Sequence, residues 1–284
     1  WEGQEDAPVE VRLSNGRTWN PDNADGRSHG IVRLDDALSR SYNQATVRLG
    51  LDIGVDRLSQ LVQVLSGVRP APNPSLILGS VDLSPFQVAQ LYQFLAGGGE
   101  VQPLRSVRGV VGPDGRSLRS YEVEIAPAQR GDAIASRLVG IALQKAVAEG
   151  TGRQLVADGL GWLQAAGKTG TSNDGRDSWF AGYTGSHLAV AWVGNDQNQA
   201  TGLYGATGAM RIWSALFRQL PTAPLSVGGD GLEWAWVDAS EYATTEETCP
   251  GATRYAFVAG RLPPQHRGCA MERLRGWFNR EREP

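Results

Sequence analysis

Ala165-Ala166-Gly167-Lys168-Thr169-Gly170-Thr171 stands directly before a strand-like segment, residues 177–195. Lysine is scarce in this chain: of its 27 basic residues, only Lys145 and Lys168 are lysines, and the others are arginines. Small neighbours leave the edge of a strand open to an extended peptide. We therefore expect this run to be an exposed strand edge whose ammonium and hydroxyls hold the carboxylate of a bound peptide. The alternative is an ordinary surface lysine that protects an edge strand from aggregation.

Periodic apolar residues predict a mixed fold around this run. Spacings of three and four indicate helices, whereas alternation and β-branched residues indicate strands. The predicted helices cover residues 34–38, 55–65, 84–96, 133–148 and 207–220. The predicted antiparallel strands cover residues 107–111, 118–123, 162–171, 178–184 and 187–195. The predicted fold class is therefore α/β (α+β), a helical half followed by an antiparallel sheet.

The composition fits one large domain with an appendage. The chain has 284 residues, 41% of them apolar, a net charge of −3 and a pI near 5.7. This charge does not predict nucleic-acid binding. We expect a main domain at residues 1–220, then a linker and small tail at residues 221–284. No apolar run could cross a bilayer and no signal peptide opens the chain. If the parent protein is exported, its exporting segment is therefore expected outside this chain.

Two cysteines, Cys249 and Cys269, lie in a stretch rich in proline and glycine. They are either unpaired thiols or a disulfide that closes a loop of about 20 residues, worth roughly 3 kcal/mol in the chain-entropy account. The even count in a loop-rich tail favours the disulfide, and with it an oxidising compartment. A short basic amphipathic helix is predicted at residues 271–280.

Ser41-Tyr42-Asn43 is the one Ser-x-Asn sequence in the chain. Its polar side chains are either helix caps or groups that project from a loop into a cleft. In a cleft, a serine hydroxyl can relay a proton and an asparagine amide can bind a substrate peptide group. The cleft hypothesis requires that this loop and the Lys168 strand face one groove.

Ser41-x-Asn43 followed by Lys168-Thr169-Gly170 resembles the second and third signature motifs of the penicillin-binding transpeptidases, whose first motif is Ser-x-x-Lys. Other segments resemble the bifunctional, class A members of that family: Trp19-Asn20-Pro21, Asp35-Asp36-Ala37-Leu38, Leu78-Gly79-Ser80, Leu83-Ser84-Pro85, Gly150-Thr151-Gly152-Arg153, Asp177-Ser178-Trp179-Phe180-Ala181-Gly182 and Tyr204-Gly205-Ala206-Thr207-Gly208-Ala209. The cysteine pair and the closing Gly276-Trp277-Phe278 resemble the 1B type of Gram-negative bacteria.

The resemblance implies the penicillin-binding protein and β-lactamase-like fold, and a serine D,D-transpeptidase. Such an enzyme cross-links peptidoglycan stem peptides by acyl transfer from D-Ala-D-Ala, and β-lactams acylate the same serine. Ser41 and Lys168 would then move protons to the leaving amine, and Asn43 would hold the acyl peptide. Thr169-Gly170-Thr171 would bind the terminal carboxylate, with the Thr171 N–H as an oxyanion donor.

No serine in the chain has a lysine three residues later, so the resemblance places the nucleophile upstream of Trp1 and predicts that the isolated chain is inactive. It also places a glycosyltransferase domain, two sheet strands and a membrane anchor outside the chain. The parent enzyme is expected on the periplasmic side of the bacterial inner membrane. An outer-membrane lipoprotein, divisome or elongasome components and a second copy are the expected protein partners.

Two other functions fit the same residues. The first is hydrolysis, as a D,D-carboxypeptidase or β-lactamase, where water replaces the amine acceptor. The second is a peptidoglycan-binding module without catalysis.

The remaining candidate residues have simpler roles in the prediction. His29, His187 and His266 are not at metal-ligand spacing, and no Gly-x-Gly-x-x-Gly follows a strand, so neither a metal nor a nucleotide cofactor is predicted. Asp177 is expected to be a carboxylate at a turn or strand start. Lys145 is expected to be a solvated helix residue.

Overall fold

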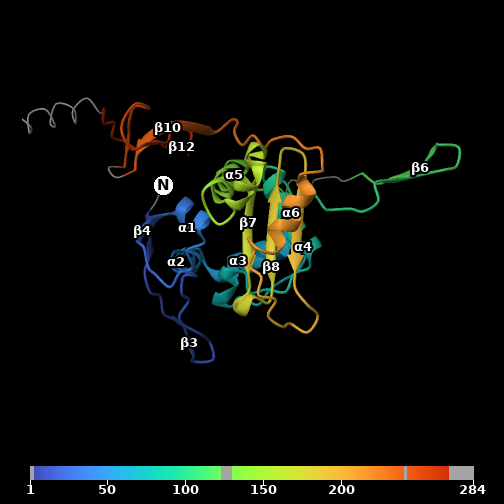
Figure 1. Ribbon diagram of the computed structural model, residues 1–284, viewed down its shortest axis with the longest axis horizontal. Coiled ribbons are helices and arrows are strands. Elements are labelled where there is room, and N and C mark those ends of the chain that lie inside the picture. Colours follow the sequence, from blue (N-terminus) through green and yellow to red (C-terminus); the bar gives the residue numbers. More distant parts are fainter. Residues whose placement is uncertain (1–2, 123–129, 240–241, 269–284) are drawn as a thin grey trace, which may run out of the picture. The chain divides into compact units, whose positions relative to one another are not determined.

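The computed structural model describes residues 3–122, 130–239 and 242–268 (Figure 1). The chain divides into two compact units, Trp1–Ser226 and Val227–Pro284. Residues 221–226 belong to the first unit, because the Gly185 N–H donates to the Ala223 carbonyl at 2.9 Å and the Leu225 N–H donates to the Leu163 carbonyl at 2.8 Å.

The first unit alternates helices with small sheets. Its helices and helical turns are α1 (Leu34–Arg40), α2 (Asn43–Ile53), α3 (Val55–Ser66), η1 (Pro74–Leu78), α4 (Pro85–Ala96), α5 (Ala133–Ala148), η3 (Val156–Leu160), η4 (Gly161–Leu163), η5 (Asn173–Gly175) and α6 (Ala209–Phe217). Its strands are β1 (Gly3–Asp6), β2 (Val11–Arg12), β3 (Thr18–Trp19), β4 (Gly30–Arg33), β5 (Gly109–Val111), β6 (Ser117–Ser120), β7 (Ala166–Thr171), β8 (Ser178–Tyr183) and β9 (Leu188–Val193).

A three-stranded antiparallel sheet, in the order β7-β8-β9, organises this unit. Its register pairs Lys168 with Ala181, and Phe180 with Ala191. A tight turn joins β8 to β9, where the Thr184 N–H donates to the His187 carbonyl at 2.8 Å. Because β7 stands at one edge of this order, the lysine-bearing run lies on a strand that has no second strand partner among the described residues.

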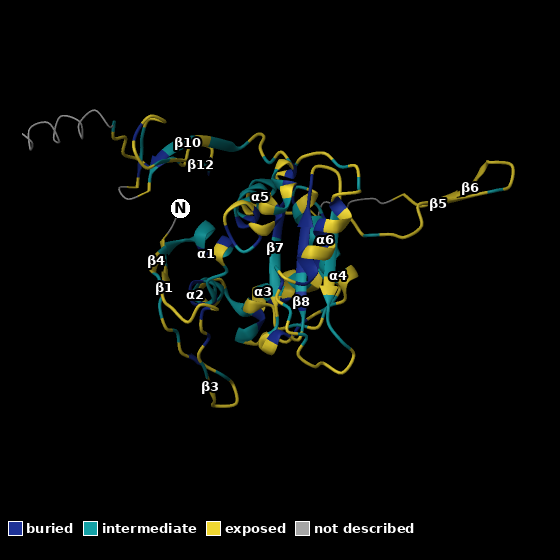
Figure 2. Cartoon of the chain, viewed as in Figure 1, coloured by how far each residue is buried: buried dark blue, intermediate teal, exposed yellow. Residues whose placement is uncertain are grey.

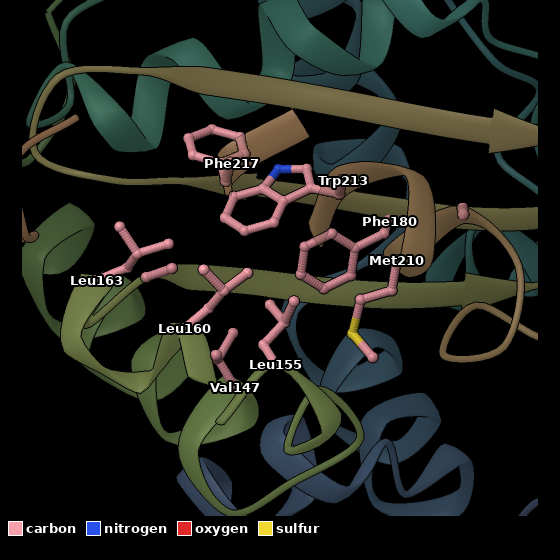
Figure 3. Close-up of a cluster of buried hydrophobic side chains, with 10 residues drawn as sticks. Val147, Leu155, Leu160, Leu163, Phe180, Met210, Trp213 and Phe217 are labelled. Carbon is pink, nitrogen blue, oxygen red and sulfur yellow. The ribbon is translucent and has the colours of Figure 1, made fainter. Parts of the chain in front are cut away.

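Side chains alternate along β8 and divide the core between the two faces of the sheet. On one face, Phe180 meets the edge of Trp213, which stacks on Phe217 of α6 with ring centroids 3.8 Å apart. Figure 3 shows these rings packed with leucines from the segment between α5 and β7. On the other face, Tyr183 packs with Leu143 of α5. Figure 1 shows α6 lying over the strands, which it contacts at β8 and β9, and the sheet is thus covered by helices on both faces.

The helices predicted within residues 34–220 are confirmed, and the starts of α4 and α5 follow ordinary capping chemistry. Ser84 accepts from the Gln87 N–H while the Gln87 side chain accepts from the Ser84 N–H, which is the reciprocal capping box expected before Pro85. The Asp132 carboxylate accepts the first free N–H groups of α5. The predicted hairpin is also present as β5 and β6, and Figure 2 shows it exposed along its length.

The first strand of the main sheet begins later than the sequence predicts. Residues 161–163 form a helical turn, and Gln164 adopts a left-handed conformation with φ of 49°. This turn places Leu163, which is fully buried, in the aromatic core. The strand therefore starts at Ala166 instead of residue 162, because burial of Leu163 outweighs the local preference for extended backbone.

The second unit contains a three-stranded antiparallel sheet in the order β11-β10-β12, made by Ala243–Thr244, Leu232–Asp238 and Ala252–Val258. Val237 and Phe257 are buried in it, and the Arg254 guanidinium lies over the Trp234 ring at 5.1 Å. Cys249 is disulfide-bonded. Cys269 and the helix predicted at residues 271–280 lie outside the described residues.

Candidate active site

Ser41 and Lys168 lie in contact although 127 positions separate them. The Lys168 Nζ donates to the Ser41 Oγ at 2.9 Å and to the Thr169 carbonyl at 3.0 Å. Ser41 ends α1 in the left-handed conformation, with φ of 61° and ψ of 46°. That conformation is costly for residues other than glycine and is often retained at functional sites. The structure therefore brings the Ser-x-Asn loop to the Lys168 strand, as the cleft hypothesis requires.

Lys168 is half-buried, and its surroundings change its acidity. Burial lowers the pKa of the Lys168 ammonium to about 8, because the charged form loses hydration. The Lys168 side chain is therefore less exposed than that of an ordinary surface lysine, although its strand lies at the edge of the sheet. An ammonium with a pKa near neutrality gives up its proton far more readily than a solvated one, which suits proton transfer.

Ser41 occupies the C-cap position of α1, and Asn43 is the first residue of α2. Tyr42 is the N-cap of α2 and makes no side-chain capping bond. The Asn43 Nδ2 instead donates to the Asp22 carbonyl at 2.7 Å. The capping alternative is thus met by the position of Ser41 but not by its hydroxyl, which contacts Lys168, nor by the Asn43 amide.

Asp6, which lies 37 positions before the start of α2, supplies the side-chain cap that Tyr42 does not provide. The sequence alone did not identify this residue. Its carboxylate is fully buried and accepts from the Ala45 N–H at 3.1 Å and from Asn23 Nδ2 at 2.7 Å. It also contacts His29 Nδ1 at 2.7 Å. The His29 ring stacks on Tyr42 with centroids 4.0 Å apart. Asp6 and His29 therefore hold the Ser-x-Asn loop, which gives His29 a structural role.

The free side of β7 presents backbone groups of both threonines. The Ser172 N–H donates to the Asp177 carbonyl across the strand pair at 3.1 Å. Backbone hydrogen bonds in an antiparallel pair alternate, so the N–H and C=O groups of Thr169 and Thr171 are directed away from β8. The contact from Lys168 to the Thr169 carbonyl agrees with this direction. An extended peptide can thus pair with these groups, and the Thr171 N–H can face a carbonyl oxygen.

The two threonine hydroxyls border a shallow depression of about 360 Å³. Thr169 Oγ1 donates to Thr151 Oγ1 at 2.7 Å, and Thr171 Oγ1 accepts from the Gly205 N–H at 3.0 Å. The depression is lined by Gly150, Thr151, Arg153, Gln154, Thr169, Thr171, Tyr204, Gly205 and Ala206. Hydroxyl and guanidinium donors on its lining suit an anionic group.

The other lysine is not the solvated helix residue that the sequence predicts. Lys145 Nζ donates to both Asp35 and Asp36 of α1, the latter at 2.8 Å, and only 18% of its side chain is exposed. Burial alone would lower the pKa of Lys145, but the two carboxylates outweigh this and raise it. The acidic pair that marks the start of α1 is thus also the anchor of α5.

Two candidates remain: Asp177, which has structural partners, and a metal site. Asp177 accepts from Ser172 Oγ at 2.8 Å and from Trp192 Nε1 at 2.9 Å, which confirms it as a carboxylate at the start of β8. Within residues 3–122, 130–239 and 242–268, no group of three His, Cys, Asp or Glu side chains is arranged to hold a metal ion.

Comparison with known proteins agrees with this geometry. Residues 5–214 match the family described as penicillin binding protein transpeptidase domain. The chain belongs to this family. It is 42% identical over 227 residues to penicillin-binding protein 1B of Escherichia coli K12, covering 78% of this chain and 26% of that protein. It is also 42% identical over 212 residues to penicillin-binding protein 1B of Vibrio cholerae, covering 74% and 27% respectively. The chain thus spans about a quarter of the length of these relatives.

The fold of this family member has solved counterparts. Penicillin-binding protein 1A of Haemophilus influenzae superposes with a TM-score of 0.81 at 21% identity, over 94% of this chain and 46% of that one. PonA1 of Mycobacterium tuberculosis superposes with a TM-score of 0.65, over 80% of this chain and 67% of that one. Among the described residues, we find no helix with the length and apolarity that a membrane crossing requires.

Proposed function

We propose that this chain is part of a peptidoglycan D,D-transpeptidase that cross-links stem peptides by serine acyl transfer from D-Ala-D-Ala. The observation that carries the proposal is the 2.9 Å contact between Lys168 Nζ and Ser41 Oγ on the open side of β7. This contact joins an acidic ammonium, a hydroxyl and a strand edge that can receive a peptide. Membership of the transpeptidase family supports the same assignment.

The proposed reaction has two steps. In the first, a serine gives its hydroxyl proton to a neighbouring base and its oxygen bonds to the carbonyl carbon of the penultimate D-alanine, while the C–N bond to the terminal D-alanine breaks and the departing nitrogen takes a proton. In the second, an amine of a neighbouring stem peptide bonds to that carbon and gives up a proton that restores the proton donor, and the serine oxygen leaves with the proton held by the base. We assign the nucleophilic serine to a Ser-x-x-Lys segment outside residues 1–284, since no such sequence occurs within them.

Ser41 and Lys168 perform the proton transfer in the first step. The departing nitrogen needs a proton, and the Ser41 O–H supplies it. The Lys168 ammonium, already donating to this oxygen, replaces that proton. Because burial lowers the pKa of Lys168 to about 8, this transfer requires less energy than it would from a solvated lysine.

The strand and the loop bind the two ends of the substrate. We assign the terminal carboxylate to the hydroxyls of Thr169 and Thr171, and the developing oxyanion to the Thr171 N–H. Asn43 Nδ2 is already bonded to Asp22, so we assign a substrate N–H to the Asn43 amide oxygen. Penicillins would acylate the same serine, and PBPA of Mycobacterium tuberculosis has been solved as an imipenem acyl-enzyme complex.

Lys168→Ala in the full-length protein tests the proposal. We expect the rate of fluorescent-penicillin acylation to fall by about 10² to 10⁴, the usual loss for a missing acid–base group. Lys145→Arg is the matched control, because it changes the other lysine and keeps a cation between its carboxylates. An unchanged acylation rate in Lys168→Ala would refute the assignment.

Product analysis separates transfer from its alternatives. With an amine acceptor present, a transpeptidase forms the cross-linked amide, whereas a carboxypeptidase or β-lactamase releases only free acid. Calorimetric titration of the 284-residue chain with a stem peptide tests the binding function, which is refuted by the absence of heat at millimolar peptide.

We also propose that the parent enzyme works on the periplasmic side of the bacterial inner membrane, where its peptidoglycan substrate lies. The disulfide at Cys249 supports an oxidising compartment. A lipoprotein, divisome or elongasome partner and a homodimer stay predictions from the family resemblance.

A further inference from the structure

The loop that follows α5 touches both halves of the proposed site. The Thr151 N–H donates to the Ser39 carbonyl at 3.1 Å, two residues before Ser41. The Thr151 hydroxyl receives the Thr169 hydroxyl at 2.7 Å, one residue after Lys168. One residue therefore connects the end of α1 to the strand that carries the lysine.

Two glycines allow this close approach. A Cβ at Gly150 would lie 2.1 Å from the Ser39 carbonyl oxygen, and a Cβ at Gly152 would lie 3.0 Å from the Val147 Cα. Both atoms belong to backbone, so a larger residue at position 150 would push the loop away from α1, and one at position 152 would push it away from α5. The Lys145 ion pairs hold the preceding helical turn against Asp35 and Asp36. The position of Thr151 is thus fixed by the contact of its loop with α1 and by the ion pairs that hold α5 against α1.

We propose that Thr151 is a positioning residue that orients the Thr169 hydroxyl for a peptide carboxylate. In the structure, Thr169 donates its hydroxyl proton to Thr151. A carboxylate only accepts hydrogen bonds, so binding it requires the Thr169 O–H to turn toward the ligand. The Thr151 O–H then donates to the Thr169 oxygen, which keeps that oxygen bonded and strengthens the new contact. This inference rests on the proposed transpeptidase function.

The hydroxyl pair predicts a specific kinetic result in the full-length protein. Thr151→Val keeps the shape of the side chain and removes only its hydroxyl. We expect KM for a D-Ala-D-Ala peptide to rise about tenfold with little change in kcat, because the carboxylate contact exists in both ground and transition states. Thr151→Ser should restore KM to within about twofold of the wild-type value. A substrate whose terminal carboxylate is an amide should show no difference between wild type and Thr151→Val.

The chain offers a matched control at the turn between β8 and β9. Thr184 Oγ1 and Thr222 Oγ1 form another hydroxyl pair at 2.6 Å. Thr222→Val removes this hydrogen bond, together with the contacts of the Thr222 hydroxyl to Ser186 Oγ and His187 Nδ1, and should leave KM unchanged. Thr151→Ala removes the same hydroxyl without adding a methyl group, and it replaces Thr151→Val if that variant does not fold.

The outcomes distinguish this inference from the proposed function. An unchanged KM in Thr151→Val and Thr151→Ala, with activity lost in Lys168→Ala, overturns the role of Thr151 alone. Equal losses of kcat and of kcat/KM, without rescue by serine, also overturn it, because they indicate a general structural role. Activity retained in Lys168→Ala refutes the proposed function itself.

Discussion

Lys145 and Lys168, the two lysines of the chain, occupy opposite electrostatic surroundings. Lys145 donates to two carboxylates, which raise its pKa. Lys168 donates to a neutral hydroxyl and a neutral carbonyl, and burial lowers its pKa to about 8. The same side chain therefore joins two helices at one place and provides a readily released proton at the other. This difference shows that the hydrogen-bond partners of a half-buried lysine, more than its burial, decide whether the lysine stabilises the fold or can transfer a proton.

The sharpest test of this comparison is direct titration of both lysines. Labelling lysine with ¹³C at Cε gives two signals in the 284-residue chain, and Lys145→Arg assigns them. Lys168 should titrate near pH 8, and Lys145 above the ordinary 10.5, so the midpoints should differ by more than about 2.5 pH units, the difference between 10.5 and 8. Coincident titration near 10.5 would show that the two surroundings are equivalent.

Stability should respond to the two lysines in opposite directions. Lys145→Met leaves two carboxylates without their cation, so the free energy of unfolding at pH 7 should fall by about 2 kcal/mol, between the values for surface and buried ion pairs. Lys168→Met removes a poorly hydrated charge and should not lower that free energy. Urea unfolding of both variants measures the contrast, and a larger loss in Lys168→Met would contradict it.

The wild-type chain gives the same information through pH. Because the folded pKa of Lys168 lies below its unfolded value, the unfolded state binds more protons between pH 8 and 10.5. The unfavourable contribution of this lysine is therefore fully present below pH 8 and disappears as pH rises to 10.5. Lys168→Met should lack this rise, whereas Lys145→Arg should keep it.

The reaction should follow the protonation of Lys168. Because the ammonium supplies the proton to Ser41, the acylation rate of the full-length protein should fall about tenfold per pH unit above pH 8. Penicillin labelling between pH 7 and 10 measures this decline. A rate that rises through pH 8 would instead identify the neutral amine as the active form.

The smallest expected effect concerns the hydrogen bond between the two motifs. Ser41→Ala removes an acceptor that stabilises the charged form of Lys168, so the pKa of Lys168 should fall by roughly half a pH unit, since water replaces part of the lost contact. Lys145 is the internal control, and its titration should not move. A rise in the pKa of Lys168 would contradict the observed donor and acceptor roles.

Local patterns in the sequence were sufficient for most of the fold. The capping box at Ser84 and the apolar spacing of residues 133–148 predict helices that the structure confirms. The two motifs, Ser41-x-Asn43 and Lys168-Thr169-Gly170, also identify the loop and the strand that meet. The helices depend on neighbours a few residues apart, which is the information that a single sequence carries, whereas the pairing of the two motifs was expected from the family resemblance.

Contacts across the chain were not predictable in the same way. Lys145 has the sequence context of an exposed helix residue, and its carboxylate partners lie more than a hundred positions earlier. Asp6 caps a helix that begins 37 positions later, at Asn43. Gln164 turns the chain so that Leu163 is buried. Each of these depends on tertiary packing, for which no spacing rule exists.

The left-handed backbone conformation of Ser41 costs stability, whereas its hydroxyl is needed for the contact with Lys168. Glycine would adopt the same dihedral angles without strain, so Ser41→Gly is expected to relieve the backbone while deleting the hydroxyl that Lys168 contacts. Selection for thermostability alone would favour that replacement, whereas selection for turnover would oppose it. At position 41, a substitution that increases the stability of the protein is thus expected to reduce its activity.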